Sequence, residues 1–146
     1  DKRPYKTHIG AVLSRTGSRR DLGVVYIHVE PGDSFLGAGF WKPEATFLRR
    51  WRRKLWQEAE AFLDIVRQLQ THGLTLETDS MLKRMPRGFE EAASGPVAEY
   101  LRWNSFLVSQ DVPDEAVLRP DFAQTVLRFA EIVLPLLEFG WDAADT

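Results

Sequence analysis

Residues 24–41, which read VVYIHVEPGDSFLGAGFW, carry the pattern that decides the fold. In residues 24–30, apolar β-branched side chains occupy one face, while Tyr26, His28 and Glu30 occupy the other. This two-residue period is typical of a half-buried strand. The EPGD sequence that follows favours a tight turn, because proline presets its own backbone and glycine accepts a positive φ. Residues 34–41 return as a second strand, so the stretch predicts a β-hairpin.

Further strands are expected on both sides of this hairpin. Residues 6–14 predict a first strand, which a polar turn at residues 15–21 joins to the hairpin as an antiparallel meander. Residues 74–83 predict a second, shorter hairpin that turns at residues 78–80, and residues 105–109 predict a last strand.

Two long helices are indicated by apolar residues that recur at three- and four-residue steps. The first begins at Pro43, and because it is long for a globular helix we allow for a break near residues 56–57. Residues 96–103 predict a short helix. The second long helix begins near residue 120 and contains Pro135, which should kink it or shorten its regular part. The stripe of the first helix consists of Leu48, Trp51, Leu55, Ala59, Phe62, Val66 and Leu69.

Together these elements predict an α+β fold, an antiparallel sheet with helices packed mainly on one face. Residues 1–146 are expected to form a single domain, because no linker or repeat divides them. The chain has no cysteine, which excludes disulfides, thiolate zinc sites and a cysteine nucleophile. No apolar run reaches the roughly 18–20 residues of a membrane span, so we expect no membrane association and a cytoplasmic location.

The net charge of −2 hides an uneven distribution. Residues 1–54 carry a balance of +7, and residues 55–146 a balance of −9. Such a division can mark an anion-binding face, or the two halves of one domain can neutralise each other across their contact. We favour mutual neutralisation, since runs of charge usually form solvated faces.

Several well-defined catalytic motifs are missing from the sequence. It has no G-x-S-x-G elbow and no glycine-rich phosphate loop. A metal site would require His8 and His28 to meet on neighbouring strands, with Glu30 or Asp33 as a third ligand. We therefore predict neither a metal nor a cofactor.

Two glycines interrupt the second strand of the hairpin. Phe35, Gly37, Gly39 and Trp41 share one face, which leaves a groove between two aromatic side chains. A glycine within a strand often marks the close approach of a ligand or of another backbone. Of these two interpretations we favour tight packing of a helix, such as the one over residues 48–69.

Four strings of the sequence, in this order, carry a family resemblance. They are PYKTHIG at residues 4–10, HVEPGDSFLGAGFW at 28–41, LKRMPRGF at 82–89 and SFLVS at 105–109. They resemble the bacterial proteins grouped as domain of unknown function 2461, whose motif is R-x-x-R-D-x-R-F-x-x-x-[DN]-K-x-x-Y. Asp1, Lys2 and Tyr5 match the last three defined positions of that motif.

The resemblance implies that the N-terminal part of the family domain is missing here. The chain would then be the C-terminal two thirds of a larger domain, and the missing part would cover apolar surface. Asn104 and Gln110 occupy positions where basic residues are common in the family, which would weaken a basic site. The family's activity is unknown, so resemblance assigns no reaction and the protein's status as an enzyme stays open.

The leading hypothesis is a binding site for a small anionic or phosphorylated ligand, with catalysis left open and no catalytic residue assigned. Lysine and arginine suit phosphate or carboxylate groups, and histidine exchanges protons near neutral pH. His8 and His28 are expected to be neighbours on adjacent strands. An alternative for the same residues is a polar sheet face covered by the missing helices. The candidate ligand-binding residues are Lys2, Tyr5, His8, Tyr26, His28, Lys83 and Arg84.

The alternative function is a non-enzymatic interaction module that uses a basic face to bind nucleic acid or an acidic protein. That face would be led by Arg49, Arg50 and Arg53, with Arg52 and Lys54 beside them. Trp51 falls on the apolar stripe, so we expect a solvated helix face instead. The sequence does not define an oligomeric state.

Overall fold

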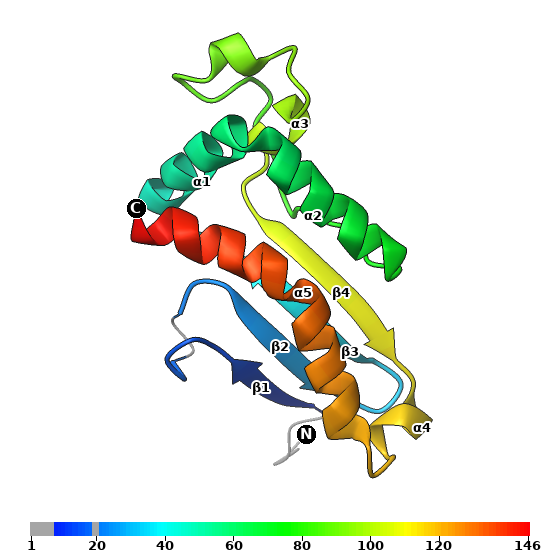
Figure 1. Cartoon of the computed structure of the whole chain (residues 1–146). Coiled ribbons are helices and arrows are strands. Elements are labelled where there is room, and N and C mark those ends of the chain that lie inside the picture. Colours follow the sequence, from blue (N-terminus) through cyan, green and yellow to red (C-terminus); the bar gives the residue numbers. More distant parts are fainter. Residues whose placement is uncertain (1–7, 19–20) are drawn as a thin grey trace, which may run out of the picture.

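The computed structural model describes residues 8–18 and 21–146. Its antiparallel sheet has the strand order β1-β2-β3-β4 (Figure 1). The strands are β1 (Ile9–Leu13), β2 (Val24–Val29), β3 (Ser34–Phe40) and β4 (Phe106–Val112). The helices are α1 (Ala45–Gln57), α2 (Ala59–Thr71), α3 (Ala98–Leu101), α4 (Asp114–Val117) and α5 (Phe122–Asp145), with a 3-10 turn, η1 (Glu90–Ala92).

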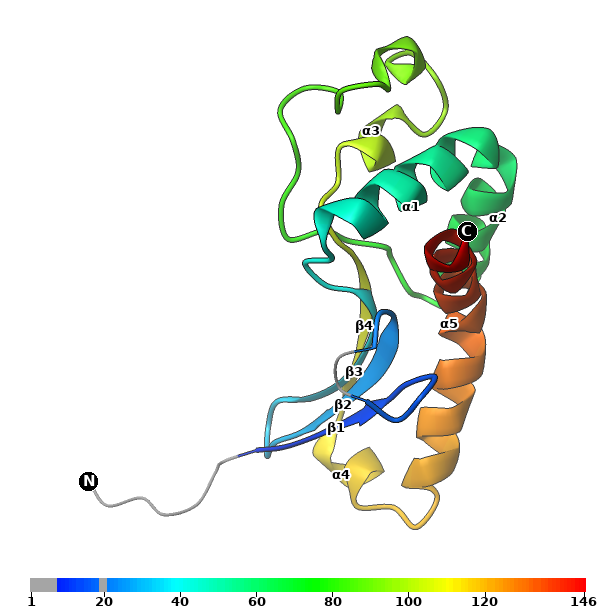
Figure 2. The same cartoon turned by 90° about the vertical axis from the view of Figure 1, so that its left-hand side faces the viewer.

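The long helices lie on one side of the sheet. Figure 2 shows α5 running along that side, and none of the helices in residues 8–18 and 21–146 lies over the opposite face. This arrangement confirms the predicted α+β fold class. None of the helices in the described part of the chain combines the length and apolar character that a membrane span needs.

The predicted hairpin forms as expected. In it β2 pairs antiparallel with β3, and His28 lies opposite Phe35. The backbone N–H of Asp33 donates to the carbonyl of Glu30 at 2.9 Å, and Gly32 adopts φ 79° in the turn between them. Of the predicted strand over residues 6–14, the described part is β1, which pairs antiparallel with β2.

The long helical pattern over residues 45–71 is divided where a break was allowed for. Glu58 leaves helical geometry with φ −120° and ψ 44°, so α1 ends and α2 begins in a new direction. Pro135 lies inside α5, and Figure 1 shows the helix changing direction near its middle, as expected where proline interrupts the hydrogen bonds.

An aromatic cluster centred on Trp51 joins the helices to the sheet. Trp51 is fully buried, and its ring lies 4.5 Å from that of Phe106 and 5.4 Å from those of Phe40 and Phe139, measured between centroids. Leu55, Phe62 and Val66 are buried as predicted. Burying one large aromatic side chain contributes about 2–3 kcal/mol, so this cluster is the main reason that α1 and α5 stay on the sheet.

The prediction of a second hairpin over residues 74–83 is wrong. Glu77 instead exchanges two backbone hydrogen bonds with Leu107 of β4, at 2.7 and 2.9 Å, and Met81 bridges to Trp103. The segment therefore pairs with β4 and the residues just before it, and not with itself. Thr78 and Asp79, two of the residues expected to form its turn, bind the buried Ser105 instead, which holds the segment in place.

Candidate functional site

The helices leave one face of the sheet bare (Figure 2). That face contains a groove of about 840 Å3. Its floor is formed by β2, β3 and β4, one wall by residues 77–79, and one end by residues 21–23. The helix expected to pack over Gly37 and Gly39 lies on the other face, so that interpretation is wrong. The lining side chains include Asp21, Tyr26, Phe35, Trp41, Glu77, Thr78, Asp79, Leu107 and Ser109.

The two glycines of β3 serve different purposes. A Cβ built on Gly39 would lie 2.0 Å from the backbone oxygen of Phe106, and Gly39 has φ 134°. Glycine is therefore required there by the close approach of β4. A Cβ built on Gly37 would meet nothing closer than 3.7 Å, which is ordinary contact. The backbone does not demand glycine at 37, and its missing side chain leaves the middle of the groove open.

The groove combines an aromatic floor with acidic walls. Tyr26 and Phe35 lie together on the floor, with ring centroids 5.9 Å apart, and Trp41 is 65% exposed. Asp21 and Asp79 add carboxylates at its two sides. Aromatic rings with a few polar groups are typical of small-molecule sites.

The charge of the lining is negative. Glu77, Asp79 and Asp21 contribute carboxylates, and no lysine or arginine belongs to the described residues that line the groove. Hydrogen bonds from the side chain and backbone of Thr16 lower the pKa of Asp21, which keeps it ionised. Lys42 lies near one end, with its ammonium 4.9 Å from the centre of the Trp41 ring.

A small hydrogen-bond network holds the acidic wall in place. The hydroxyl of Ser105 donates to Asp79 Oδ1 at 2.5 Å and accepts from the backbone N–H of Asp79 at 3.1 Å. The backbone N–H of Ser105 donates to the hydroxyl of Thr78 at 3.2 Å. Since Ser105 is fully buried, this network positions Asp79 before any ligand arrives.

Beyond the Phe35 end of the groove lies a histidine cluster, made of His8, Tyr26, His28, Glu30 and Phe35. The His28 ring is stacked between those of His8 and Phe35, with centroids 4.8 Å away on each side. Its Nδ1 lies 3.3 Å from the Tyr26 hydroxyl and its Nε2 lies 2.8 Å from Glu30 Oε1. The predicted proximity of the two histidines is confirmed.

The two histidines meet diagonally, because the residue opposite His28 on β1 is Gly10. The Tyr26 hydroxyl lies over Gly10, only 2.8 Å from where a Cβ would stand. Glycine at position 10 therefore lets Tyr26 reach His28. His8, two residues before Gly10 and on the same face, stacks on the His28 ring.

The structure does not bring the other candidate residues to this cluster. Lys83 and Arg84 are exposed, just past the bridge between Met81 and Trp103. Across the sheet, His28 pairs with Phe35, and Phe35 pairs with Asp111 of β4. Trp103 lies eight residues before Asp111, which corresponds to about 25 Å at about 3.3 Å per residue. The candidates Lys2 and Tyr5 lie outside the described residues. For all seven candidate residues given in the sequence analysis, a role in ligand binding stays a prediction.

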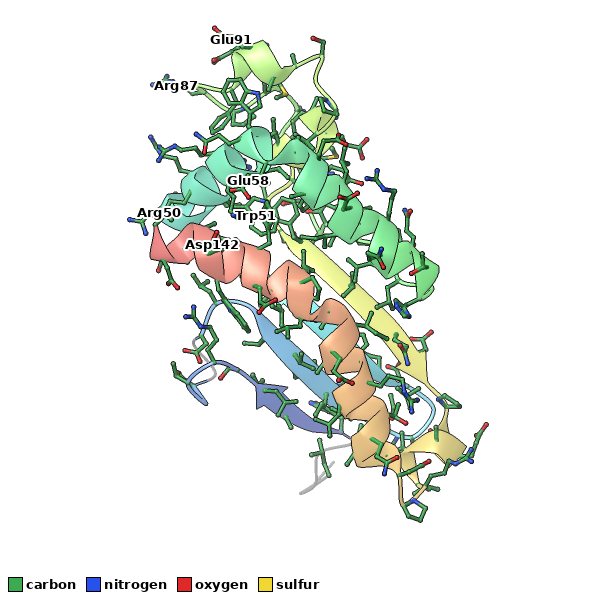
Figure 3. The ribbon with its side chains drawn as sticks, viewed as in Figure 1. Arg50, Trp51, Glu58, Arg87, Glu91 and Asp142 are labelled. Atoms are coloured by element: carbon green, nitrogen blue, oxygen red, sulfur yellow. The ribbon has the colours of Figure 1, made fainter. Side chains whose placement is uncertain are left out.

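The basic stretch of α1 divides between surface and interior. Arg49, Arg50 and Arg53 are exposed as predicted, and Figure 3 shows Arg50 on the outer side of α1. Arg52 was expected beside them on the solvated face, but it is buried. Its guanidinium donates to the backbone carbonyls of Leu101 at 2.7 Å and Trp103 at 2.9 Å. Burial lowers the pKa of Arg52.

Acidic side chains neutralise part of the same surface. Lys54 donates to Asp142 at 2.6 Å and to Glu58 at 2.8 Å. Arg50 donates to the carbonyl of Ala144 at 2.9 Å. Trp51, which a stacking surface for bases would need, points into the core between α1 and α5 (Figure 3).

The sequence did not reveal the acidic wall of the groove. Residues 77–79 were assigned to a hairpin of their own, so their position beside β4 could not be inferred. The useful signal was the pair of glycines in β3, although we favoured helix packing over the groove that they also suggested.

Comparisons with known proteins return a family but no activity. The family model described as a conserved hypothetical protein (DUF2461) matches residues 1–139. No curated protein and no solved structure matches the chain. Since the family model covers nearly the whole sequence, the chain belongs to the DUF2461 family.

Proposed function

We propose that the protein binds a small molecule in the groove on the open face of its sheet. The ligand combines a flat apolar ring with a positively charged or hydrogen-bond-donating group. The observation that carries this proposal is Gly37, whose missing side chain opens the groove although the backbone does not require glycine there. We assign no reaction to the site.

The lining supports this ligand class. A ring inserted over Gly37 would contact Phe35 and Leu107 and gain the stacking and burial that aromatic sites provide. An amine on the ring could reach Glu77 or Asp79, whose carboxylates accept charge-assisted hydrogen bonds.

The anionic or phosphorylated ligand expected from the sequence receives less support in this groove. Three carboxylates would repel it, and no described lysine or arginine lines the groove to attract it. Of the cations assigned to such a site, Lys83 and Arg84 lie at a distance from the histidine cluster and Lys2 lies outside the described residues. An anion would therefore need a source of positive charge other than the groove lining.

The interaction module with a basic face is also less well supported. Burial of Trp51 removes the stacking platform, and Asp142 and Glu58 neutralise Lys54. The exposed Arg49, Arg50 and Arg53 match the solvated helix face that we expected.

A matched pair of probes tests the proposal. Tryptamine and indole-3-acetate share one ring but carry opposite charges, and saturation-transfer NMR on the full chain gives the affinity of each. We expect tryptamine to bind at least tenfold more tightly than indole-3-acetate. Gly37→Leu, which fills the groove, should weaken tryptamine at least tenfold, and Glu77→Gln should weaken it several-fold.

The control is Ala123→Leu, which adds the same side chain to the exposed surface of α5 and should change neither affinity. Equal binding of tryptamine by the wild type and the Gly37→Leu variant would place its site elsewhere and refute the proposal. If indole-3-acetate bound more tightly than tryptamine, the result would instead support the anionic ligand predicted from the sequence.

A further inference from the structure

The turn between β2 and β3 holds two carboxylates close to His28. Glu30 and Asp33 are its end residues, joined by the backbone hydrogen bond that closes the turn. The hydroxyl of Ser34 accepts from the Glu30 N–H at 2.9 Å and donates to the Glu30 carbonyl at 3.0 Å. On the outer side, the Gly32 N–H donates to Asp114 at 2.9 Å. These contacts hold the turn from both sides.

Three potential ligand atoms converge above this turn. One atom each from His28, Glu30 and Asp33 lies within 4.8 Å of the other two. Ligands that sit about 2.0–2.2 Å from a shared ion are separated by roughly 3–4 Å, so small side-chain rotations suffice to close the set. The closest pair, His28 Nε2 and Glu30 Oε1, is already 2.8 Å apart.

The imidazole of His28 is oriented for coordination through Nε2. The rings of His8 and Phe35 hold it on both faces, with interplanar angles of 22° and 21°. Its Nδ1 lies 3.3 Å from the Tyr26 hydroxyl, so a neutral ring can donate there and direct its Nε2 lone pair toward the carboxylates. Histidines that bind metals are commonly oriented by such a second hydrogen bond.

The donor set also limits the kind of ion. One imidazole nitrogen and two carboxylates suit a divalent first-row ion such as Zn2+ or Mn2+, and three protein ligands leave positions for water or a ligand. The His28 side chain is 13% exposed and that of Glu30 is 29% exposed, whereas Asp33 is exposed, so an ion can reach the site from solvent.

We propose that His28, Glu30 and Asp33 form a binding site for one divalent transition-metal ion. From the sequence, we considered His8 and His28 with either Glu30 or Asp33 as a third ligand and predicted no metal, whereas here both carboxylates lie beside His28. His8 stacks on the ligand but does not coordinate. The proposal is independent of the groove, since it needs no organic ligand.

Isothermal titration of the full chain with Zn2+, in a buffer that does not chelate metals, tests this site. We expect one ion per chain with a micromolar dissociation constant. Glu30→Gln and Asp33→Asn should each weaken binding at least tenfold, because each loses one charged ligand. Glu60→Gln, which removes an exposed carboxylate on α2, is the matched control and should bind as the wild type does.

A second measurement uses the wild type alone, so it does not depend on whether the variants fold. Mn2+ should broaden the backbone NMR signals of residues 28–34 before those of any other segment. Absence of a saturable one-to-one phase, unchanged affinity in both variants, or broadening spread over other acidic surfaces would overturn the proposal. His28 and Glu30 would then form a simple ion pair.

Discussion

Substituting alanine for each of the two glycines of β3 should give opposite results. At Gly37 the new Cβ would lie 3.7 Å from Phe35 and from the Val108 carbonyl, so it fits. Alanine should raise the free energy of unfolding by about 0.5–1 kcal/mol, because glycine weakens a strand by that amount. At Gly39 the new Cβ would lie 2.0 Å from the Phe106 oxygen, which belongs to the backbone and cannot rotate away.

The expected loss for Gly39→Ala follows from two terms. Forcing a side chain onto φ 134° costs about 1–3 kcal/mol, and overpacking adds about 1–3 kcal/mol. A total of at least about 3 kcal/mol is a large part of the roughly 5–15 kcal/mol that stabilises a domain. Relieving the clash requires the backbone of β3 or β4 to shift.

Urea denaturation followed by circular dichroism measures both variants. With a slope of about 2 kcal/mol per M, Gly39→Ala should lower the midpoint by about 1.5 M or more, and Gly37→Ala should leave it unchanged or slightly higher. If Gly37→Ala lowered the free energy of unfolding as much as Gly39→Ala does, the reasoning would be refuted. The backbone would then require glycine at position 37, and the groove would not explain it.

Three further substitutions test the packing on the helical side. Gly140→Ala would place a Cβ 2.0 Å from the Phe40 ring, so thermal unfolding should show a loss of about 1–3 kcal/mol although alanine favours helix. Arg52→Met should cost about 1–3 kcal/mol for each buried carbonyl that loses its donor, whereas the exposed Arg53→Met should cost less than about 0.5 kcal/mol. Desolvation opposes the charge of Lys54, but hydrogen bonds and attraction to its acidic partners outweigh it and raise its pKa. The stabilisation that charged Lys54 contributes should therefore be constant at neutral pH and be lost only as the pH rises through this raised pKa. The difference in free energy of unfolding between wild type and Lys54→Met should accordingly shrink above about pH 10.4.

The elements with strong local patterns could be predicted from the sequence. Alternation over residues 24–30 and the turn at residues 30–33 specified the hairpin, and the same alternation placed Tyr26 and His28 on one face. The apolar stripe of the first helix identified Trp51 as core. In each case the residues that decide the structure lie within a few positions of one another.

The parts that depend on distant partners could not be predicted. Within residues 74–83, Glu77 pairs with Leu107 of β4 and Met81 pairs with Trp103, about 20–30 residues later, and nothing in their own sequence distinguishes this from a hairpin. Arg52 lies between exposed arginines in the sequence, and only the carbonyls of Leu101 and Trp103 explain its burial. Glu30 or Asp33 was named from the sequence as a third ligand beside His8 and His28, but the pattern could not reveal that both carboxylates converge on His28.

A protein-detected NMR titration of the full chain with tryptamine tests the central claim most directly. If the open face of the sheet is a ligand site, backbone amide shifts should concentrate at Gly37, Gly39, Leu107 and Ser109. The same residues should stay unperturbed in the Gly37→Leu variant. Shifts centred on the surface of Arg50 and Arg53, or identical shifts in the wild type and the filled variant, would contradict the account.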